Sequence, residues 1–164
     1  LGGIAKGWSV DEALAILRKY SIHHALCSAS GDIAIGESPP GKKGWKIGIR
    51  ALDKQGNIYD RRLRLRNCAV STSGDTVQFI EISGQRYSHI VNPKTGQGLA
   101  NRIMVIVIAQ TATEADSQAT AISVLGMEEG LAYAQKKDIA VMITPMHGES
   151  QTARTSSKWQ ERFP

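Results

Sequence analysis

The first twenty residues carry a hydrophobic pattern with a helical period. Apolar residues recur every three or four positions, which predicts one buried helical face. These positions are Val10, Ala13, Leu14, Leu17 and Tyr20. Ser9 and Glu12 have the spacing of a capping box, and the alternative is a helix that begins nearer Ala5.

Short apolar runs separated by turn residues follow this helix and predict a series of strands. The runs cover residues 24–29, 33–36, 45–51, 58–65, 68–71, 76–82 and 86–91. Pro39-Pro40-Gly41 and the segment 53–57 have the composition of turns. Ser83-Gly84-Gln85 is typical of a tight hairpin loop, so the last two runs are expected to pair with each other.

The second half of the chain predicts a buried strand, then two helices, then another strand. Residues 103–109 are continuously apolar, which suits a strand covered on both faces. Thr111 and Glu114 form a capping box for a helix that Gly126 should end, and a shorter helix is expected over about 128–137. Residues 139–144 predict the final strand. Helices combined with antiparallel strands indicate the α+β class.

Composition and cysteine usage narrow the class of protein. A length of 164 residues corresponds to a single domain, and the content of 41% apolar and 21% charged residues is typical of a globular protein. No apolar run reaches the length of a membrane-spanning helix. Cys27 and Cys68 lack the spacing of a zinc site. Both are expected to be buried as small hydrophobic residues. The alternative is that they form a single disulfide.

The net charge of +5 is concentrated in one segment. Residues 42–66 hold nine of the Lys and Arg residues and only two acids, so nucleic-acid binding has to be considered. In Arg62-Leu63-Arg64-Leu65-Arg66, however, charge alternates with leucine at period two, which predicts a strand with one solvated and one packed face. Aromatic residues for base stacking are scarce, at 5%. No nucleic-acid partner is therefore expected.

Asp116 and Thr120 are candidates for binding a cation. They are four residues apart on a predicted helix, so their side chains leave the same face one turn apart. A carboxylate and a hydroxyl suit a hard cation such as Mg²⁺. The alternative is structural: Asp116 is a favourable first-turn charge and Thr120 bonds back to its own helix.

Three further segments are candidates for phosphate binding or proton transfer. Residues 71–75 (STSGD) predict a hydroxyl-rich turn between strands, and residues 2–7 (GGIAKG) would allow an anion close to the backbone, with Lys6 as the charge. His89 precedes an Asn-Pro turn and could act as a general acid or base. The alternatives are a plain serine-threonine turn, a glycine-rich helix start and a strand histidine bonded to a carbonyl.

Five segments together resemble the successive motifs of the ApbE-type FAD:protein FMN transferases. They are GGIAKGWSVD (2–11), GDI (31–33), STSG (71–74), HIVNPKTG (89–96), and EADSQATA (114–121) with VLG (124–126). The resemblance extends over about residues 2–144. It implies a T-fold-like antiparallel sheet packed with helices, and makes residues 1–164 a single, partial domain that lacks an upstream part of the flavin pocket.

The resemblance also implies an activity and its residues. FAD would bind with Mg²⁺, FMN would pass to a Thr or Ser hydroxyl of an acceptor flavoprotein, and AMP would leave. The Mg²⁺ ligands would be Asp116, Thr120 and the Ala5 carbonyl. Lys6 and Asp11 would line the nucleotide site, Ser73 and Gly74 would meet the pyrophosphate, and His89 would transfer the proton. FAD pyrophosphatase activity at the same site and a non-catalytic flavin-binding or interaction module are the alternatives.

Two departures from the family pattern bear on turnover. Asn92 stands where the family usually has Asp, and Ser28-Ala29-Ser30-Gly31 stands where it usually has Asn-x-Gly-Gly. The resemblance further implies a periplasmic or membrane-anchored location in the cell envelope. Without the upstream part of the pocket, this chain alone is expected to bind FAD weakly, to transfer little or no FMN, and to self-associate through exposed apolar surface.

Overall fold

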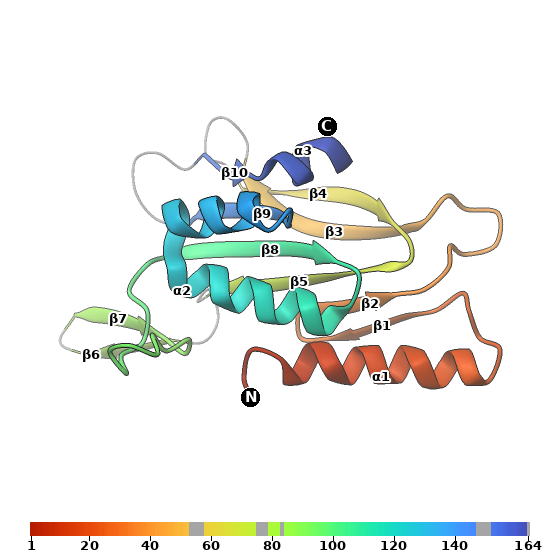
Figure 1. The fold of residues 1–164 in the computed structure, drawn as a ribbon, viewed down its shortest axis with the longest axis horizontal. Helices are drawn as coiled ribbons and strands as arrows, with labels where there is room; N and C mark the ends of the chain where they lie inside the picture. The colour runs from red at the N-terminus through yellow and green to blue at the C-terminus, as the bar shows by residue number, and fades with distance from the viewer. Residues whose placement is uncertain (53–57, 75–78, 83, 147–151, 164) are drawn as a thin grey trace.

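A six-stranded antiparallel sheet forms the centre of the computed structural model (Figure 1), which describes all residues except 53–57, 75–78, 83, 147–151 and 164. The order of the strands across the sheet is β1-β2-β5-β8-β9-β10. Their bounds are β1 Leu26–Ala29, β2 Asp32–Ile35, β5 Cys68–Gly74, β8 Ile103–Ala109, β9 Ala140–Pro145 and β10 Arg154–Thr155. Segments from both halves of the chain therefore lie side by side in one sheet.

Two helices cover one face of this sheet (Figure 1): α1 (Ala5–Lys19) and α2 (Ala112–Lys136). The face of α2 that meets the sheet is built mainly from small residues, with Ala115 and Ala119 completely buried beside the larger Ile122. Small side chains allow the helix to pack closely on Val105 and Val107 of the central strand. The long helix is interrupted at Gly126, whose φ of 82° is non-helical and favours glycine.

A two-stranded ribbon and a short helix cover the opposite face of the sheet. The ribbon pairs β3 (Trp45–Leu52) with β4 (Ile58–Leu65), and the helix α3 spans Ser157–Arg162. Trp159 of α3 is 1% exposed within this second core. Every residue from 103 to 108 is buried, which confirms the prediction of a central strand covered on both faces.

A separate hairpin stands apart from the main sheet, at the left of Figure 1. It pairs β6 (Phe79–Ile82) with β7 (Gln85–Ser88), and Ile82 is the partner of Gln85. The predicted tight hairpin is therefore confirmed. All four residues of β6 are exposed, so this hairpin presents apolar side chains to solvent.

The predicted α+β class is confirmed, and the helix boundaries follow the capping chemistry. The Thr111 hydroxyl accepts a hydrogen bond from the Glu114 N–H at 3.1 Å, as its capping box predicts. The first helix begins at Ala5, the alternative start; the Ser9 hydroxyl donates to the Lys6 carbonyl inside the helix and caps nothing. The two predicted helices around Gly126 are the two halves of α2.

Other sequence expectations need correction. Residues 71–74 are not a turn but the end of strand β5, where they pair with β8. The run predicted over 86–91 leaves the strand after Ser88. Strand β10 and helix α3 were not predicted, because their segments lack a clear period. The predicted turn at 53–57 and the start of the run at 76–78 lie outside the described residues.

The two cysteines do not form a disulfide. Cys27 packs against the core under the helices, whereas Cys68 belongs to the core on the opposite face of the sheet. Both thiols are free, and burial raises the pKa of each above its usual value. The expected burial is confirmed for Cys68, whereas Cys27 is only partly buried. No helix in the described part of the chain is long and apolar enough to span a membrane.

Candidate functional site

A charged cluster lies between the first turn of α1, strand β2 and helix α2. The Lys6 ammonium forms an ion pair with Asp32, and its Nζ is 3.9 Å from Oδ1 of Asp116. Asp32 also accepts a hydrogen bond from the Ser71 hydroxyl on the neighbouring strand. Asp32 and Asp116 are 0% and 2% exposed, so two carboxylates share one ammonium in a buried place.

Glycine at position 7 allows α1 to pack closely against α2 beside this cluster. The Gly7 N–H donates to Oδ2 of Asp116 at 3.1 Å. A Cβ atom at this position would lie 2.2 Å from the Ala112 carbonyl oxygen, so any other residue would push the two helices apart. The first turn of α1 thus touches Asp116 through a backbone group as well as through Lys6.

Asp11, one turn further along α1, connects α1 to α2 by hydrogen bonds. Its two carboxylate oxygens accept the N–H groups of Ala112 and Thr113, each at 2.8 Å, and the Thr113 hydroxyl at 2.6 Å. These N–H groups belong to the first turn of α2. The N–H groups of a first helical turn have no acceptor within their own helix. Asp11 therefore caps the start of α2, and the nucleotide-lining role that the family resemblance implies for it stays a prediction.

The cluster has an unbalanced charge. Burial raises the pKa of Asp116, and the nearby Asp32 carboxylate raises it further, while the Gly7 N–H and the Lys6 ammonium lower it. With all three groups ionised, two negative charges face one positive charge. A second cation beside Asp116 would offset the remaining charge, which makes this a favourable place for a metal ion.

A polar strip on α2 connects the cluster to the end of strand β5. Thr120 follows Asp116 by one turn and lies against Gly3, where a Cβ atom would be 2.8 Å from its Oγ1. One turn further, the Ser123 hydroxyl donates to Ser73 Oγ at 3.2 Å. Four predicted site residues thus lie on or beside this strip: Lys6, Ser73, Asp116 and Thr120. Gly74, the next residue after Ser73, pairs with Met104 at the strand end.

The donor set along this strip fits Mg²⁺. Asp116 offers a carboxylate, Thr120 a hydroxyl, and Ala5 a carbonyl in the helix turn that touches Asp116. All are oxygen ligands, which hard cations prefer. No group of three or more His, Cys, Asp or Glu side chains that could hold a metal ion gathers anywhere in the described ranges, so the candidate set has a single carboxylate ligand, Asp116. A site with few protein ligands leaves positions for water and phosphate oxygens, as is usual for Mg²⁺.

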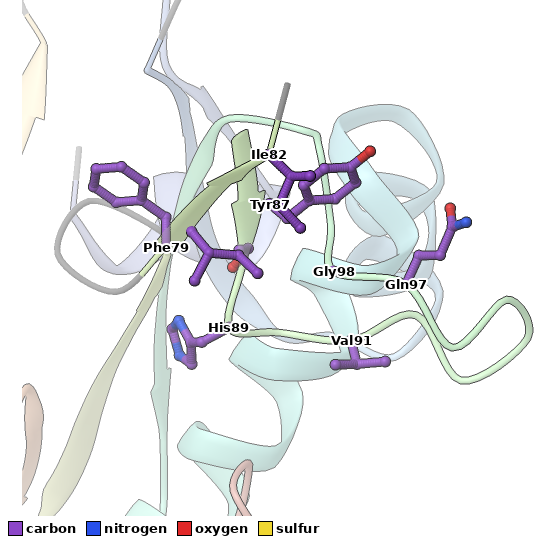
Figure 2. A pocket seen from close by; sticks show the side chains of 9 residues that line it. Phe79, Ile82, Tyr87, His89, Val91, Gln97 and Gly98 are labelled. Carbon is purple, nitrogen blue, oxygen red and sulfur yellow. The ribbon is translucent and has the colours of Figure 1, made fainter. Parts of the chain in front are cut away.

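His89 lies in a different place, at an apolar pocket of about 720 Å³ beside the β6–β7 hairpin. Figure 2 shows the side chains that surround it. The lining residues are Phe79, Ile80, Ile82, Tyr87, Ser88, His89, Val91, Gln97 and Gly98. Neither α1 nor α2 contributes to the described lining. A large, mainly apolar pocket with a few polar groups is the kind of surface that an aromatic ligand could occupy.

Asn92 stabilises the turn after His89 through two hydrogen bonds. Its side-chain oxygen accepts the Lys94 N–H at 2.9 Å, and its carbonyl accepts the Gly96 N–H at 2.8 Å. An Asp at this position could accept the same bonds. The departure from the family pattern therefore preserves the turn and removes a negative charge three residues from the histidine.

Asp32, Ser71 and the Gly7 N–H take part in the cluster. Ser71 and Gly7 belong to the segments predicted to bind phosphate, but none of the three was predicted to bond to another site residue. The available cue was Asp32, a lone acid at the start of the apolar run 33–36. Such a residue is buried only when it is paired. The pairing itself depends on β2 and β5 lying side by side, with Asp32 opposite Ser71.

Sequence comparisons place known relatives over most of the chain. The ApbE family model matches residues 1–143. The FAD:protein FMN transferase of Vibrio cholerae serotype O1 is 32% identical over 144 residues, which is 87% of this chain and 43% of that protein. The FAD:protein FMN transferase of Treponema pallidum is 34% identical over 141 residues, or 80% and 39%. The chain thus spans less than half the length of these relatives.

Solved structures of ApbE proteins agree with these sequence matches. The apo form of the Pseudomonas stutzeri flavinyl transferase ApbE superposes with a TM-score of 0.84 at 31% identity, covering 98% of this chain and 50% of that one. The ApbE protein of Thermotoga maritima gives a TM-score of 0.84 at 28% identity, covering 100% and 53%. The five motifs that carried the resemblance lie within the matched residues. The chain belongs to the ApbE family.

Proposed function

We propose that this chain forms the metal- and phosphate-binding part of an FAD:protein FMN transferase. FMN would be transferred from FAD to a Thr or Ser hydroxyl of an acceptor flavoprotein, and AMP would be released. The observation that carries the proposal is the buried cluster in which Asp32 and Asp116 share the Lys6 ammonium. The relatives named FAD:protein FMN transferase support the reaction class.

The bonds made and broken define what the residues have to do. The acceptor hydroxyl oxygen forms a bond to the FMN phosphorus, the bond from that phosphorus to the bridging oxygen breaks, and AMP departs with that oxygen. The hydroxyl proton goes to a base, for which His89 is the candidate at the pocket beside the hairpin. When bound, Mg²⁺ supplies positive charge to the pyrophosphate oxygens.

The remaining residues would bind and orient the substrate. Lys6 is 43% exposed at its side chain, so its ammonium can contact a phosphate oxygen without leaving its ion pair with Asp32. Ser73 and Gly74, at the open end of β5, would meet the pyrophosphate. The apolar side chains around His89 are exposed in the chain alone, so they would exclude water from the attacking hydroxyl only once FAD and the acceptor cover them, which would favour transfer over hydrolysis.

The test is to incubate the chain with FAD, Mg²⁺ and the acceptor of the Vibrio cholerae relative, with that full-length enzyme as positive control. The expected result is a low level of flavin fluorescence that migrates with the denatured acceptor, well below that of the full-length control, together with an equal amount of AMP. AMP with free FMN would indicate an FAD pyrophosphatase instead. FAD binding without AMP release would indicate a non-catalytic module and would overturn the proposal.

Two substitutions connect the assay to the cluster. Asp116→Ala should abolish Mg²⁺-dependent AMP release, because it removes the only carboxylate of the proposed ligand set. Ser117→Ala is the matched control, since the Ser117 hydroxyl donates to the Glu114 carbonyl within the same helix turn. Equal activity of the two variants would contradict the metal assignment.

A further inference from the structure

The outward surface of the β3–β4 ribbon gathers positive charge on one flat face. In the register of the ribbon, Lys46 lies opposite Arg64 and Arg50 lies opposite Asp60. Residues opposite each other in an antiparallel pair share a face. The alternate positions Ile47, Ile49, Leu63 and Leu65 are buried against the main sheet. We call the exposed set Lys46, Arg50, Asp60, Arg62 and Arg64 the basic face.

The charges of the basic face lack partners within the described residues. Four cations accompany one acid, and no ion pair joins any of these cations to a carboxylate among the described residues. Exposed Lys42, Lys43 and Arg66 continue the charge at the ends of the ribbon. Side chains on one strand face repeat at about 6.6–6.8 Å, so the cations form a planar array.

The basic face lies on the opposite side of the molecule from the cluster. The ribbon packs on one face of the six-stranded sheet, while α1 and α2 cover the other. Lys6 and Asp116 belong to the helical side. A surface bound to the ribbon would therefore leave the cluster and its helices facing away from that surface.

We infer that the basic face binds an anionic phospholipid membrane surface. A protein partner would require an apolar centre in the interface, and the described outward positions of the ribbon present no large apolar side chain. A single-stranded nucleic acid would require aromatic platforms, and the outward set contains none. A plane of lipid phosphates needs only a flat cluster of about four to eight Lys and Arg residues.

The experiment is co-sedimentation of the chain with vesicles at low and physiological salt. Mixed phosphatidylcholine–phosphatidylglycerol vesicles should bind it, pure phosphatidylcholine vesicles should not, and added salt should weaken binding. The triple variant Lys46→Gln, Arg62→Gln, Arg64→Gln should lose about a hundredfold in affinity. The matched control Arg18→Gln, Lys19→Gln, Lys136→Gln removes the same charge from exposed positions on the helices and should retain binding.

The two triple variants distinguish binding by the basic face from binding by net charge. Equal loss in both would show that net charge alone drives binding and would overturn the inference. Equal binding to neutral vesicles would overturn it as well. Double-stranded DNA that displaces the chain from mixed vesicles at physiological salt would identify a nucleic acid as the partner. Thermal melting of each variant checks that the fold persists, which is expected for exposed substitutions.

Discussion

The Gly7 N–H donates to Oδ2 of Asp116 at 3.1 Å, across 109 residues of sequence. This bond places the start of the first helix against the start of the second. It also places Lys6 beside Asp116, since Lys6 and Gly7 are adjacent in α1. The candidate metal site therefore depends on how α1 and α2 pack as much as on the side chains that would bind the ion.

Asp116→Asn should remove the stabilisation that Mg²⁺ gives to the chain. At a Mg²⁺ concentration of about 100 times Kd, the wild-type chain should gain about 2.7 kcal/mol, or roughly 5–11 °C in Tm. Asn is a weak ligand for a hard cation, so Mg²⁺ should not change the Tm of the variant. Differential scanning calorimetry with and without Mg²⁺ measures both shifts. A full Mg²⁺ response in the variant would contradict the assignment.

The same variant should change the pH dependence of stability without metal. The pKa of Asp116 is raised above its ordinary value of 3.8, so the folded state holds this proton more tightly than the unfolded state. This contribution is fully present below pH 3.8 and is lost as the pH rises through the raised pKa. The stability of Asp116→Asn relative to wild type should therefore increase from acid to neutral pH, as measured by urea unfolding.

Asp11→Ala should destabilise the chain by about 0.5–2 kcal/mol, the usual cost of a lost helix cap. The substitution leaves the Ala112 and Thr113 N–H groups without their carboxylate partner. Glu12→Ala is the control, because Glu12 is exposed and should change stability by less than about 0.5 kcal/mol. Chemical denaturation compares the two, and similar midpoints would show that the cap contributes little.

Gly7→Ala should separate the two helices and weaken Mg²⁺ binding. The added methyl would meet the Ala112 carbonyl oxygen at 2.2 Å, and overpacking of this kind costs about 1–3 kcal/mol. Gly2→Ala adds the same methyl where nothing lies within 4 Å. Titration with Mg²⁺, followed by Tm, should show a weaker response for Gly7→Ala only.

His89→Gln should reduce FMN transfer while leaving the Mg²⁺ response of Tm unchanged. The reason is that His89 lines the pocket beside the hairpin, whereas the proposed metal ligands lie on α1 and α2. Loss of a general base lowers rates by about 10²–10⁴-fold. Transfer is followed by acceptor fluorescence in the presence of FAD. A variant that also loses the Mg²⁺ response would show that the two places are coupled.

The local elements can be predicted from the sequence, because their causes are local. The apolar run 103–109, the capping box at Thr111 and the stop at Gly126 depend on periodicity and backbone preference within a few residues. Each appears in the structure as predicted. The motifs also indicated the family, since five segments in order are specific even where each alone is weak.

Which polar residues meet depends on how distant segments pack against one another. Asp11 and Asp116 are both helix acids, yet one binds a helix terminus and the other faces Lys6 and Asp32. Asp32 joins the cluster because β2 pairs with β5 and because Gly7 allows α1 to pack closely on α2. Such contacts depend on packing between distant segments, and hydrophobic periodicity fixes only which face of each segment is buried.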